Sequence, residues 1–574
     1  MAVNRLQVSD DGVIESPLSV EIPPTDLFSY IVSSGTALSR QSPSYFDATS
    51  PSKNYTVDDA VIMAKRFGRG LQSLGLNRQD KVLLYSGNDL FFPIVVWGVT
   101  AAGGVFTGAS PTASAHELEY QLRDSEAKIL LSSVEGLCVA EKAANKVGLS
   151  LDRVLVLGSR KCQDSDQART RSWTDIWATP KDVESWVWTT INTKEEAMST
   201  TAVINYSSGT TGLPKGVELT HYNIIANAEQ IVKKRILVGD SESGRARRAR
   251  LELSGERWLA AVPMYHAFGQ SYFCVIAPRL GAKVFIMPKF NLLQYLEFVD
   301  IYRISFINVV PAMLAMLCKV ENPGRFNFKA IESMTSGAAP LDPATAAKFQ
   351  QLFLRDGVFV KQGWGMTETT SNVTGFSLDD EDGGRSIGWL SPNCKARIIP
   401  VKGHKFEGAS EGRSLGELWV AGPNIMKGYW KREEETKGAF VIEKGERWLR
   451  TGDIAYVDER GCFYIVDRMK TQELIKVNGL QVSPAEMEKG LMAHAGVVDA
   501  AVVSYQENGR EYPRAFVVRN NSSVSAAELH TFVKSRFSRH KWLTGGIFFI
   551  ERVPRNPSGK IVRRELPKIK ESKL

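Results

Sequence analysis

Short apolar runs alternate with helix-forming segments through the first three hundred residues, and this alternation limits the folds that are open to the chain. The runs are rich in leucine and β-branched residues, as buried central strands are. They span residues 81–85, 128–132, 153–158, 258–263, 283–287 and 305–310. Thr56 can cap a helix that precedes the first run. The apolar positions of this helix recur every three or four residues: Val61, Ala64, Phe67, Leu71 and Leu74. Strands that alternate with helices predict a layered α/β body.

The pattern changes twice after this body. Between residues 388 and 467, strand-like runs lie between turn signals and predict a smaller β-rich lobe. Beyond Asp467, strand-like and helical segments outline an α+β unit of about a hundred residues, an ordinary domain size. A length of 574 residues also exceeds what one core supports. The predicted fold class is α/β: an N-terminal domain over residues 1–467, made of the body and the lobe, and a small, mobile α+β C-terminal domain over residues 468–574.

The segment YSSGTTGLPKGVELTH, residues 206–221, is a candidate phosphate site. Its small and hydroxyl-bearing residues let backbone N–H groups and hydroxyls close around an anion, and Lys215 adds a positive charge. For these residues alone, a flexible surface loop is the alternative. The Walker phosphate loop does not match, because its lysine directly follows a glycine and opens a helix. Here Pro214 precedes Lys215 and residues 217–220 predict a strand, so we expect a mobile loop between two strands that folds over phosphates.

Charge and composition argue against several classes of protein. The net charge of +8 is spread over 574 residues, and its densest cluster, residues 245–250, has no interleaved aromatic residues. This cluster predicts a solvated, helical surface insertion and no nucleic-acid partner. The most apolar window, residues 91–110, contains glycines and a proline and predicts a buried helix and turn, with no membrane span. The six cysteines are scattered and the histidines lack metal spacing, so we expect neither disulfides nor structural zinc.

The two ends of the chain bear on its location. The first sixteen residues lack an apolar core and are no signal peptide. The chain finishes with Ser572, Lys573 and Leu574, which is the address read by the peroxisomal import receptor. A chance match of three residues is the alternative. The ending predicts a peroxisomal protein that is otherwise cytoplasmic.

Seven motifs follow one another along the chain. They are SSGTTGLPKG (207–216), PMYHAFG (263–269), SGAAPL (336–341), QGWGMTET (362–369), TGD (451–453), DRMK (467–470) and PRNPSGKIVRREL (554–566). Each motif is weak evidence alone, but seven in this order are specific. On these residues the chain resembles the adenylate-forming superfamily over nearly its whole length. Within that superfamily it is most similar to the acyl- and aryl-CoA ligases of the 4-coumarate–CoA ligase branch.

This resemblance implies the fold of adenylate-forming enzymes and an ATP-dependent carboxylic acid–CoA ligase. In that family the acid first attacks the α-phosphorus of ATP and releases pyrophosphate, and coenzyme A then takes the acyl group from AMP. Mg²⁺ softens the repulsion between the phosphate groups. A carrier-protein-loading adenylation enzyme, a luciferase-like oxygenase and an inactive nucleotide-binding homologue are the alternatives. No carrier domain follows Lys560, which argues against the first of them.

By motif match, the resemblance assigns residues to each part of the nucleotide. Ser207 to Thr211 and Lys215 are expected at the β- and γ-phosphates, and other residues at the adenosine and its ribose. The nucleotide-binding set is Ser207, Ser208, Gly209, Thr210, Thr211, Lys215, Ala339, Gln362, Gly363, Asp453 and Arg468.

The resemblance also names the residues closest to the chemistry. Thr367 is expected to reach the α-phosphate, Glu368 to hold Mg²⁺, and Lys560 to bridge the incoming carboxylate and the α-phosphate. Taken alone, Glu368 could cap a helix and Lys560 could be one solvated cation of a basic tail. His266 is expected to gate the path between the acyl pocket and the thiol channel. A general base is not needed there, because the acid is already ionised at pH 7.

The second half-reaction requires Lys560 to leave the site, since its presence blocks the thiol. In the family the C-terminal unit rotates about a hinge, here Lys470, and brings the Gly479 loop to the thiol tunnel. Lys289, Asn478 and Gly479 are the expected contacts of coenzyme A. Two features depart from the family pattern. Thr471-Gln472 is inserted beside the hinge, where it either alters the pivot or bulges outward, and Asn478 stands where a lysine is common.

The acyl pocket is expected to have a polar floor. Its predicted residues are Phe268, Tyr272, Gly337, Gly363, Ser371 and Asn372. Ser371 and Asn372 stand where plant coumarate ligases usually have proline and valine. An unpaired buried amide is costly, so the floor predicts an acid with a hydrogen-bonding tail or a pocket that holds water. Aryl or arylalkanoic acids and medium-chain fatty acids both stay open as substrates.

Overall fold

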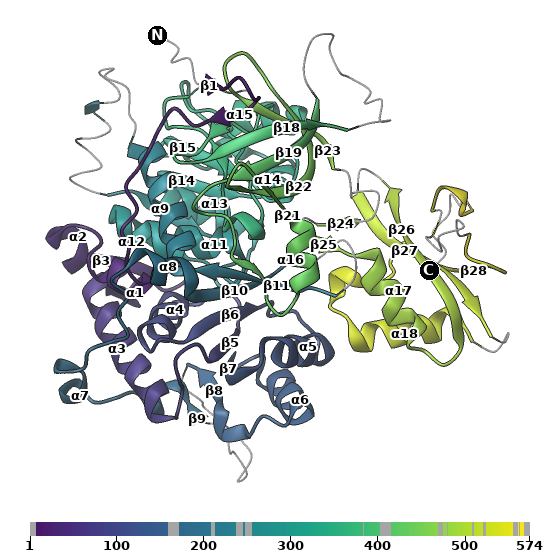
Figure 1. Cartoon of the computed structure of the whole chain (residues 1–574), viewed down its shortest axis with the longest axis horizontal. Helices are drawn as coiled ribbons and strands as arrows, with labels where there is room; N and C mark the ends of the chain where they lie inside the picture. Colours follow the sequence, from purple (N-terminus) through teal and green to yellow (C-terminus); the bar gives the residue numbers. More distant parts are fainter. Residues whose placement is uncertain are drawn as a thin grey trace.

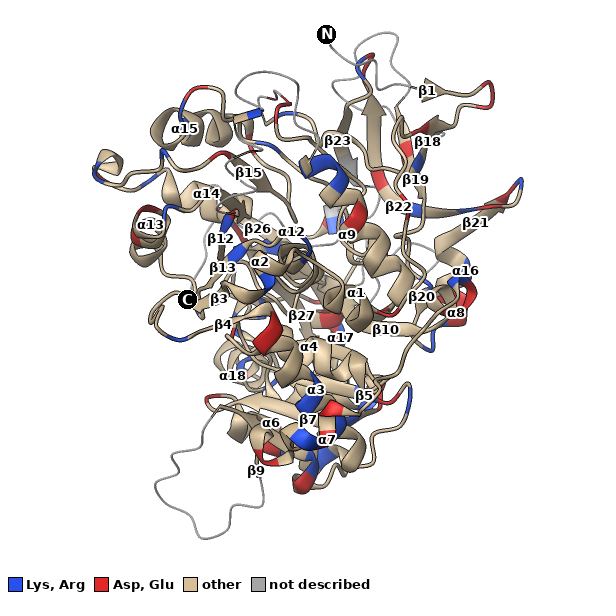
Figure 2. Ribbon diagram, turned by 90° about the vertical axis from the view of Figure 1, so that its left-hand side faces the viewer, with Lys and Arg blue, Asp and Glu red and all other residues tan. Residues whose placement is uncertain are grey.

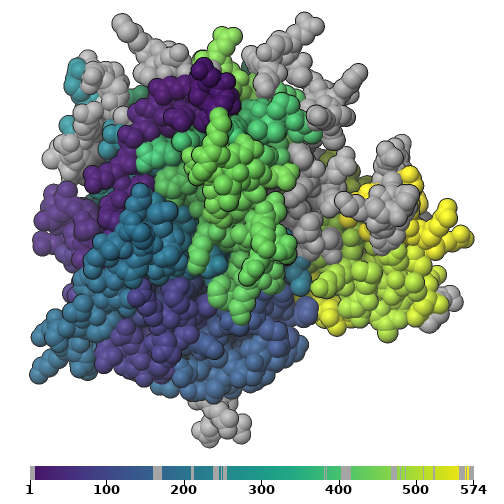
Figure 3. Space-filling model, in the orientation of Figure 1, coloured from purple at the N-terminus to yellow at the C-terminus, as the bar shows by residue number. Residues whose placement is uncertain are grey.

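The computed structural model has a large N-terminal part, with a smaller C-terminal part packed beside it (Figures 1 and 3). It describes residues 7–158, 171–207, 213–236, 245–246, 249, 255–380, 382, 384–401, 415–468, 475–478, 480–507, 510–520, 524–554, 561 and 563–567. Among the described residues, basic and acidic positions are interspersed along the ribbon (Figure 2). Of the basic cluster 245–250, only Arg245, Ala246 and Ala249 are described, and all three are exposed.

An eight-stranded sheet forms one layer of the N-terminal part, in the order β20-β11-β10-β6-β5-β7-β8-β9. Its strands β5, β7 and β8 confirm the first three predicted runs, and they pair in parallel. The strands β10 and β11 are antiparallel, with Ser207 opposite Lys215, so two strands flank the candidate phosphate loop as expected. The bounds are β5 (Lys81–Tyr85), β6 (Val105–Ala109), β7 (Ala127–Ser133), β8 (Val154–Leu157), β9 (Arg171–Ser172), β10 (Thr201–Ser207), β11 (Lys215–Thr220) and β20 (Gly428–Tyr429).

A second, six-stranded sheet has the order β15-β14-β12-β13-β3-β4. It contains the three later predicted strands, each of which ends earlier than predicted. Its parallel pairs bring the carboxyl ends of β14 and β15 to one edge, where the motif that begins at Ser336 follows. The bounds are β3 (Pro43–Asp47), β4 (Asn54–Thr56), β12 (Arg257–Ala260), β13 (Lys283–Ile286), β14 (Phe306–Val309) and β15 (Ser333–Ser336).

Helices cover these sheets and confirm the α/β prediction. Helix α3 begins after Thr56, whose side chain accepts from the Asp59 N–H while Asp59 caps in return. Every residue of α4 is buried, and the described residues include no helix that is long and apolar enough to cross a membrane. The helices of this part are α1 (Leu27–Val32), α2 (Ala37–Gln41), α3 (Val57–Ser73), α4 (Phe92–Ala101), α5 (Ala115–Ser125), α6 (Leu137–Val147), α7 (Pro180–Glu184), α8 (Lys194–Ser199), α9 (His221–Ile236), α11 (Ala267–Gln270), α12 (Ala277–Leu280), α13 (Leu292–Ile301), α14 (Pro311–Leu317) and α15 (Pro343–Phe353).

The predicted β-rich lobe is a largely antiparallel sheet with the order β1-β2-β18-β19-β22-β21, in which β23 also pairs with β22. Two strands from the beginning of the chain complete its edge, which the sequence pattern did not predict. The bounds are β1 (Gln7–Val8), β2 (Ile14–Glu15), β18 (Lys395–Pro400), β19 (Gly416–Ala421), β21 (Phe440–Glu443), β22 (Glu446–Val457) and β23 (Phe463–Arg468), with α16 (Glu433–Ala439) before β21.

The C-terminal part has a three-stranded sheet, a hairpin and two helices, as the α+β prediction requires. Its buried apolar residues form two clusters on opposite faces of the sheet, both separate from the main core of the N-terminal part. The bounds are β24 (Ile475–Val477), β25 (Leu480–Val482), α17 (Pro484–Met492), β26 (Val497–Glu507), β27 (Arg510–Arg519), α18 (Ala526–Arg536) and β28 (Ile547–Phe549).

His221 links the start of α9 to the N-terminal segment. Its Nδ1 accepts a hydrogen bond of 2.9 Å from the Leu27 N–H, and burial lowers the pKa of His221 to about 3. The unfolded chain therefore binds a proton that the folded chain excludes between pH 6.5 and pH 3, so stability falls as the pH drops through this window.

We expect this histidine alone to lower the free energy of unfolding by about 1.4 kcal/mol between pH 7.5 and pH 5.5. Urea denaturation at both pH values measures the change. The His221→Asn variant keeps an acceptor near the position of Nδ1 but cannot titrate. Its free energy of unfolding should therefore fall by about 1.4 kcal/mol less than that of the wild type between the two pH values. An equal loss in the two proteins would contradict the assignment.

Candidate active site

A cavity of about 1490 Å³ opens between the two sheets, the β-rich lobe and the C-terminal part. Most of the residues predicted for the site, though far apart in sequence, line this one space. They are Ser207, Lys215, His266, Phe268, Gly337, Ala339, Gln362, Gly363, Thr367, Glu368, Ser371, Asn372 and Asp453.

Glu368 is the centre of a polar cluster at the end of the β10–β11 hairpin. It lies in a short 3₁₀ turn, η5 (Thr367–Thr369), and is buried. Its Oε1 accepts from the Tyr429 hydroxyl at 2.9 Å and from Ser207 Oγ at 3.2 Å. Lys215 Nζ lies 5.2 Å from the centre of the Tyr429 ring. A carboxylate, two hydroxyls and a lysine thus converge from three separate segments.

Two loops shape the side of the cavity where the adenosine was expected. The Gln362 side chain accepts from the Leu341 N–H at 3.2 Å and donates to the Gly384 carbonyl at 2.8 Å, so it ties these loops together. Gly363 N–H donates to the Ser336 carbonyl at 3.0 Å. Ala338, within the SGAAPL motif, has a φ of 69°, a strained conformation for a residue with a Cβ. Strain of this kind is typical of functional loops.

Asp453 lies on β22 and also lines the cavity. Its Oδ2 accepts from Trp364 Nε1 at 2.8 Å, and its backbone N–H donates to Thr451 Oγ1 at 3.0 Å. Arg468 pairs with Asp453 in the β22–β23 ladder, so the two residues predicted at the ribose face one another on adjacent strands. The Arg468 side chain lies outside what the structure describes.

Buried amides hold the loop that carries Ser371 and Asn372. Asn227 Nδ2 donates to the Asn372 carbonyl at 2.7 Å, and Asn424 Nδ2 donates to the Thr369 carbonyl at 3.1 Å. Ser371 Oγ donates to Asn372 Oδ1 at 2.8 Å, so the two predicted polar residues bind one another. A Cβ at Gly363 would come within 2.8 Å of Asn372 Nδ2, so a larger residue there would displace this amide.

Tyr272 lies outside the large cavity. It lines a second, smaller cavity of about 40 Å³, which shares Thr335, Gln362 and Asn372 with the first. Tyr272 belongs to a π-helical stretch, η3 (Ser271–Ile276), a rare geometry that is frequent at functional sites. The predicted acyl-pocket residues therefore bound two adjoining spaces, with Phe268 in the first and Tyr272 in the second.

Arg235 also lines the small cavity, and the sequence pattern did not predict this. It is buried, forms an ion pair with Glu256 and stacks over the Phe306 ring with its guanidinium carbon 3.8 Å from the ring centre. Its Nε has no hydrogen-bond partner among the described residues. Burial raises the pKa of Tyr272 to about 12, so this hydroxyl stays protonated at neutral pH. The small cavity is thus polar.

His266 faces the large cavity from the start of α11. His266 is exposed at the cavity wall, yet the protein atoms around it desolvate its ring and lower its pKa. The ring is therefore neutral at pH 7 and adds no charge to the site.

Several predicted residues lie elsewhere. Lys289 is exposed after β13, and Asn478 is exposed in the β24–β25 turn with a φ of 51°; neither lines the large cavity. The residues that flank this turn, Lys476, Leu480 and Gln481, do line it. The remaining predicted positions are outside the described residues: Ser208, Gly209, Thr210, Thr211, Lys470, Thr471-Gln472, Gly479, Lys560 and Ser572-Lys573-Leu574.

Comparisons with known proteins identify the family of the chain. The family model for the AMP-binding enzyme matches residues 38–430, and that for the AMP-binding enzyme C-terminal domain matches residues 486–560. A phenylacetyl-CoA ligase from Aspergillus niger is 33% identical over 97% of this chain and 99% of its own length. A 4-coumarate–CoA ligase-like protein from Arabidopsis thaliana is 33% identical over 88% of this chain and 84% of its own length. A peroxisomal OPC-8:0-CoA ligase from the same organism is 30% identical over 92% of this chain and 90% of its own length.

Among solved structures, an amide bond synthetase from Marinactinospora thermotolerans has the same fold. Its TM-score is 0.74 at 21% identity, over 94% of this chain and 98% of the other. The chain belongs to the AMP-binding enzyme family, in the group that includes the 4-coumarate–CoA ligase-like proteins. It is an ATP-dependent acid–CoA ligase that forms AMP.

Proposed function

We propose that the large cavity carries out both half-reactions of this ligase on an aryl or arylalkanoic acid or a medium-chain fatty acid. The observation that carries the proposal is the convergence of Glu368, Lys215 and Ser207 on the wall of a cavity that Phe268 and Asn372 also line. Ordinary ligand pockets measure roughly 300–1,000 Å³. A volume of about 1490 Å³ has room for a nucleotide and an acid together.

In the first half-reaction an oxygen of the acid attacks the α-phosphorus of ATP. The bond from that phosphorus to the bridging oxygen breaks, and pyrophosphate leaves with the electron pair. Negative charge accumulates at the phosphorus, so fixed donors and cations are the main source of acceleration. We assign Lys215 and the loop from Ser207 to Thr211 to the β- and γ-phosphates, Thr367 to the α-phosphate, and Lys560 to the acid and the α-phosphate.

Glu368 fits a Mg²⁺ ion. Mg²⁺ prefers oxygen ligands and is usually bound through one or two carboxylates together with substrate phosphates. Glu368 offers such a carboxylate beside hydroxyls of Ser207 and Tyr429. The ion would supply positive charge against the repulsion between AMP and pyrophosphate.

In the second half-reaction the sulfur of coenzyme A attacks the acyl carbon, the carbon–oxygen bond to AMP breaks, and the thiol proton passes to solvent. We assign residues 1–467 and 468–574 to two domains that rotate about Lys470. Asn478 and Gly479, with Lys289, are assigned to coenzyme A. His266 separates the acyl end from the thiol path.

The small cavity supports an acid with a hydrogen-bonding group at its far end. Arg235 and Tyr272 offer donors there, and Thr335 and Asn372 border both cavities. A buried donor that meets an apolar tail loses its partners in water, whereas a hydroxyl or carbonyl on the tail compensates for this loss.

We also propose import into peroxisomes through the receptor that reads Ser572-Lys573-Leu574. The sequence of the ending and the relative named as peroxisomal support this location.

Release of AMP and pyrophosphate across a panel of acids, with and without coenzyme A, tests the function. We expect 4-hydroxyphenylacetate and 8-hydroxyoctanoate to exceed phenylacetate and octanoate in kcat/KM by about 5- to 10-fold each, the value of one buried hydrogen bond. Preference for the unsubstituted acid in both pairs would contradict the polar tail. AMP without acyl-CoA would instead favour a carrier-loading enzyme, light emission would indicate a luciferase-like oxygenase, and no AMP would indicate an inactive homologue.

A further inference from the structure

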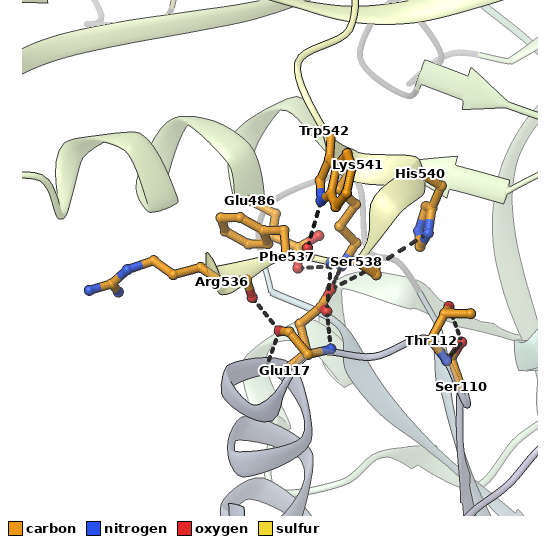
Figure 4. A network of polar contacts seen from close by, with 11 residues as sticks. Ser110, Thr112, Glu117, Glu486, Arg536, Phe537, Ser538, His540, Lys541 and Trp542 are labelled. Atoms are coloured by element: carbon orange, nitrogen blue, oxygen red, sulfur yellow. Dashed lines mark hydrogen bonds and ion pairs between the residues drawn. The ribbon is translucent and has the colours of Figure 1, made fainter. Parts of the chain in front are cut away.

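The N-terminal end of α5 contacts a short segment that follows α18, and this contact joins the two parts of the chain (Figure 4). Lys541 Nζ donates to Glu117 Oε1 at 2.7 Å and to Glu486 Oε1 at 2.8 Å. Ser538 N–H donates to Glu117 Oε2 at 2.9 Å, and Ser114 Oγ donates to the Arg536 carbonyl. We call Ser114, Glu117, Glu486, Ser538 and Lys541 the interdomain latch.

The latch is buried although it lies at a boundary between two parts. The side chains of Glu117, Lys541 and Glu486 are 13%, 10% and 3% exposed. Burial alone would raise the pKa of Glu117, but Lys541 outweighs this effect and the pKa is lowered. Burial would likewise lower the pKa of Lys541, but Glu486 and Glu117 raise it. The charges of Glu117 and Lys541 therefore depend on one another, and separating the two parts would break the pair.

Glu117 has two roles that can be separated. Its Oε2 accepts from the Ser114 N–H at 2.8 Å and completes the capping box of α5, which is local to the N-terminal part. Its contacts with Ser538 and Lys541 are the ones that reach across the boundary. Glutamine also completes a capping box, so Glu117→Gln preserves the helix cap and removes the ion pair.

The latch holds one particular orientation of the C-terminal part. In this orientation the flanks of the β24–β25 turn, Lys476 and Gln481, line the large cavity. Ile561, which directly follows the expected catalytic lysine, packs instead with Phe516 and Val553 in a cluster on the sheet, and it does not line the cavity. The orientation thus presents to the cavity the hairpin expected at the thiol and keeps Ile561 outside it.

We propose that Glu117 and Lys541 are positioning residues that hold the C-terminal part in the orientation for thioester formation. The proposal rests on the two-step function assigned above. The adenylation step uses Lys560 and so requires another orientation, in which the latch is broken. If the latch is lost, fewer molecules adopt the orientation for the second step, and the rate of that step falls in proportion to their population. The first step does not use this orientation, so its rate is preserved.

Separate assays of the half-reactions test the latch in the full-length protein. The first is pyrophosphate release with acid and ATP; the second is acyl-CoA formation from supplied acyl-adenylate and coenzyme A in a single turnover. We expect Glu117→Gln and Lys541→Met each to slow the second step by about 10- to 100-fold and to change the first by less than about twofold. Lys534→Met is the matched control, since Lys534 is an exposed lysine of the same part that contacts only the Trp542 ring among its described partners, and it should behave as wild type.

The double variant separates positioning from a general loss of stability. Glu117→Gln with Lys541→Met should be no slower than Lys541→Met alone, because Lys541→Met already removes the contact with Glu117. Lys541→Arg should recover part of the second-step rate. Equal slowing of both steps, additive effects in the double variant, or no slowing at all would each overturn the latch. Failure of the wild-type protein to release pyrophosphate in the first assay or to form acyl-CoA in the second would instead overturn the function on which the latch rests.

Discussion

Replacing Lys560 by alanine is expected to slow acyl-adenylate formation by about 100- to 1,000-fold or more while acyl-CoA formation from supplied acyl-adenylate changes only a few-fold. A positive charge aimed at the reacting phosphate acts where negative charge develops, and removal of one such donor typically costs this much. In the second step Lys560 has left the phosphate with the rotated C-terminal part, so its removal changes that rate little. Pyrophosphate release and single-turnover thioester formation measure the two rates.

The control for Lys560→Ala is Lys568→Ala, which removes a charge from the same basic tail. If Lys560 were one solvated cation among several, both variants would behave alike. Equal loss of the two half-reactions in Lys560→Ala would contradict the two-orientation assignment. The position of Ile561 makes this test informative, since in the observed orientation the residue next to Lys560 packs away from the cavity.

Local sequence signals predicted the elements on which the site is built. The helix after Thr56 and the strands at residues 81–85 and 127–133 follow from capping and from apolar runs, which act between neighbours in the chain. The strands β12, β13 and β14 end one to three residues earlier than predicted. The residues beyond these ends have already left the sheet at its carboxyl edge. The apolar composition of a run does not tell where a strand ends and a loop begins.

Contacts between distant residues could not be predicted in this way. Tyr429 binds Glu368, and Trp364 binds Asp453, across 61 and 89 positions of the chain. Glu117 is the clearest case. The capping box between Ser114 and Glu117 joins neighbours in the chain, but the ion pair to Lys541 spans 424 positions and depends on how two cores dock. Sequence motifs predicted many of the residues that line the cavity, whereas the partners that orient them required the fold.

Glu368→Gln is expected to slow adenylation by about 100- to 1,000-fold and to raise the Mg²⁺ concentration needed for half-maximal rate. Glutamine has nearly the same shape and its Oε1 can still accept from Tyr429 and Ser207, so the turn that carries Glu368 should stay in place. What the substitution removes is the negative charge that attracts the ion. Pyrophosphate release measured as a function of Mg²⁺ therefore separates this role from a structural one.

The matched control for Glu368 is Tyr429→Phe, which removes one hydrogen bond to the same oxygen and keeps the charge. We expect about a 10-fold loss of adenylation or less, because the carboxylate is then less well oriented but still present. Its Mg²⁺ dependence should match that of the wild type. Two results would contradict the assignment: a wild-type Mg²⁺ dependence in Glu368→Gln, or an equal shift of the Mg²⁺ dependence in Tyr429→Phe. In either case the carboxylate would hold the loop together and the ion would bind elsewhere. If only Glu368→Gln shifts the Mg²⁺ dependence, the site requires the charge itself, since both variants disturb the same hydrogen-bonded cluster.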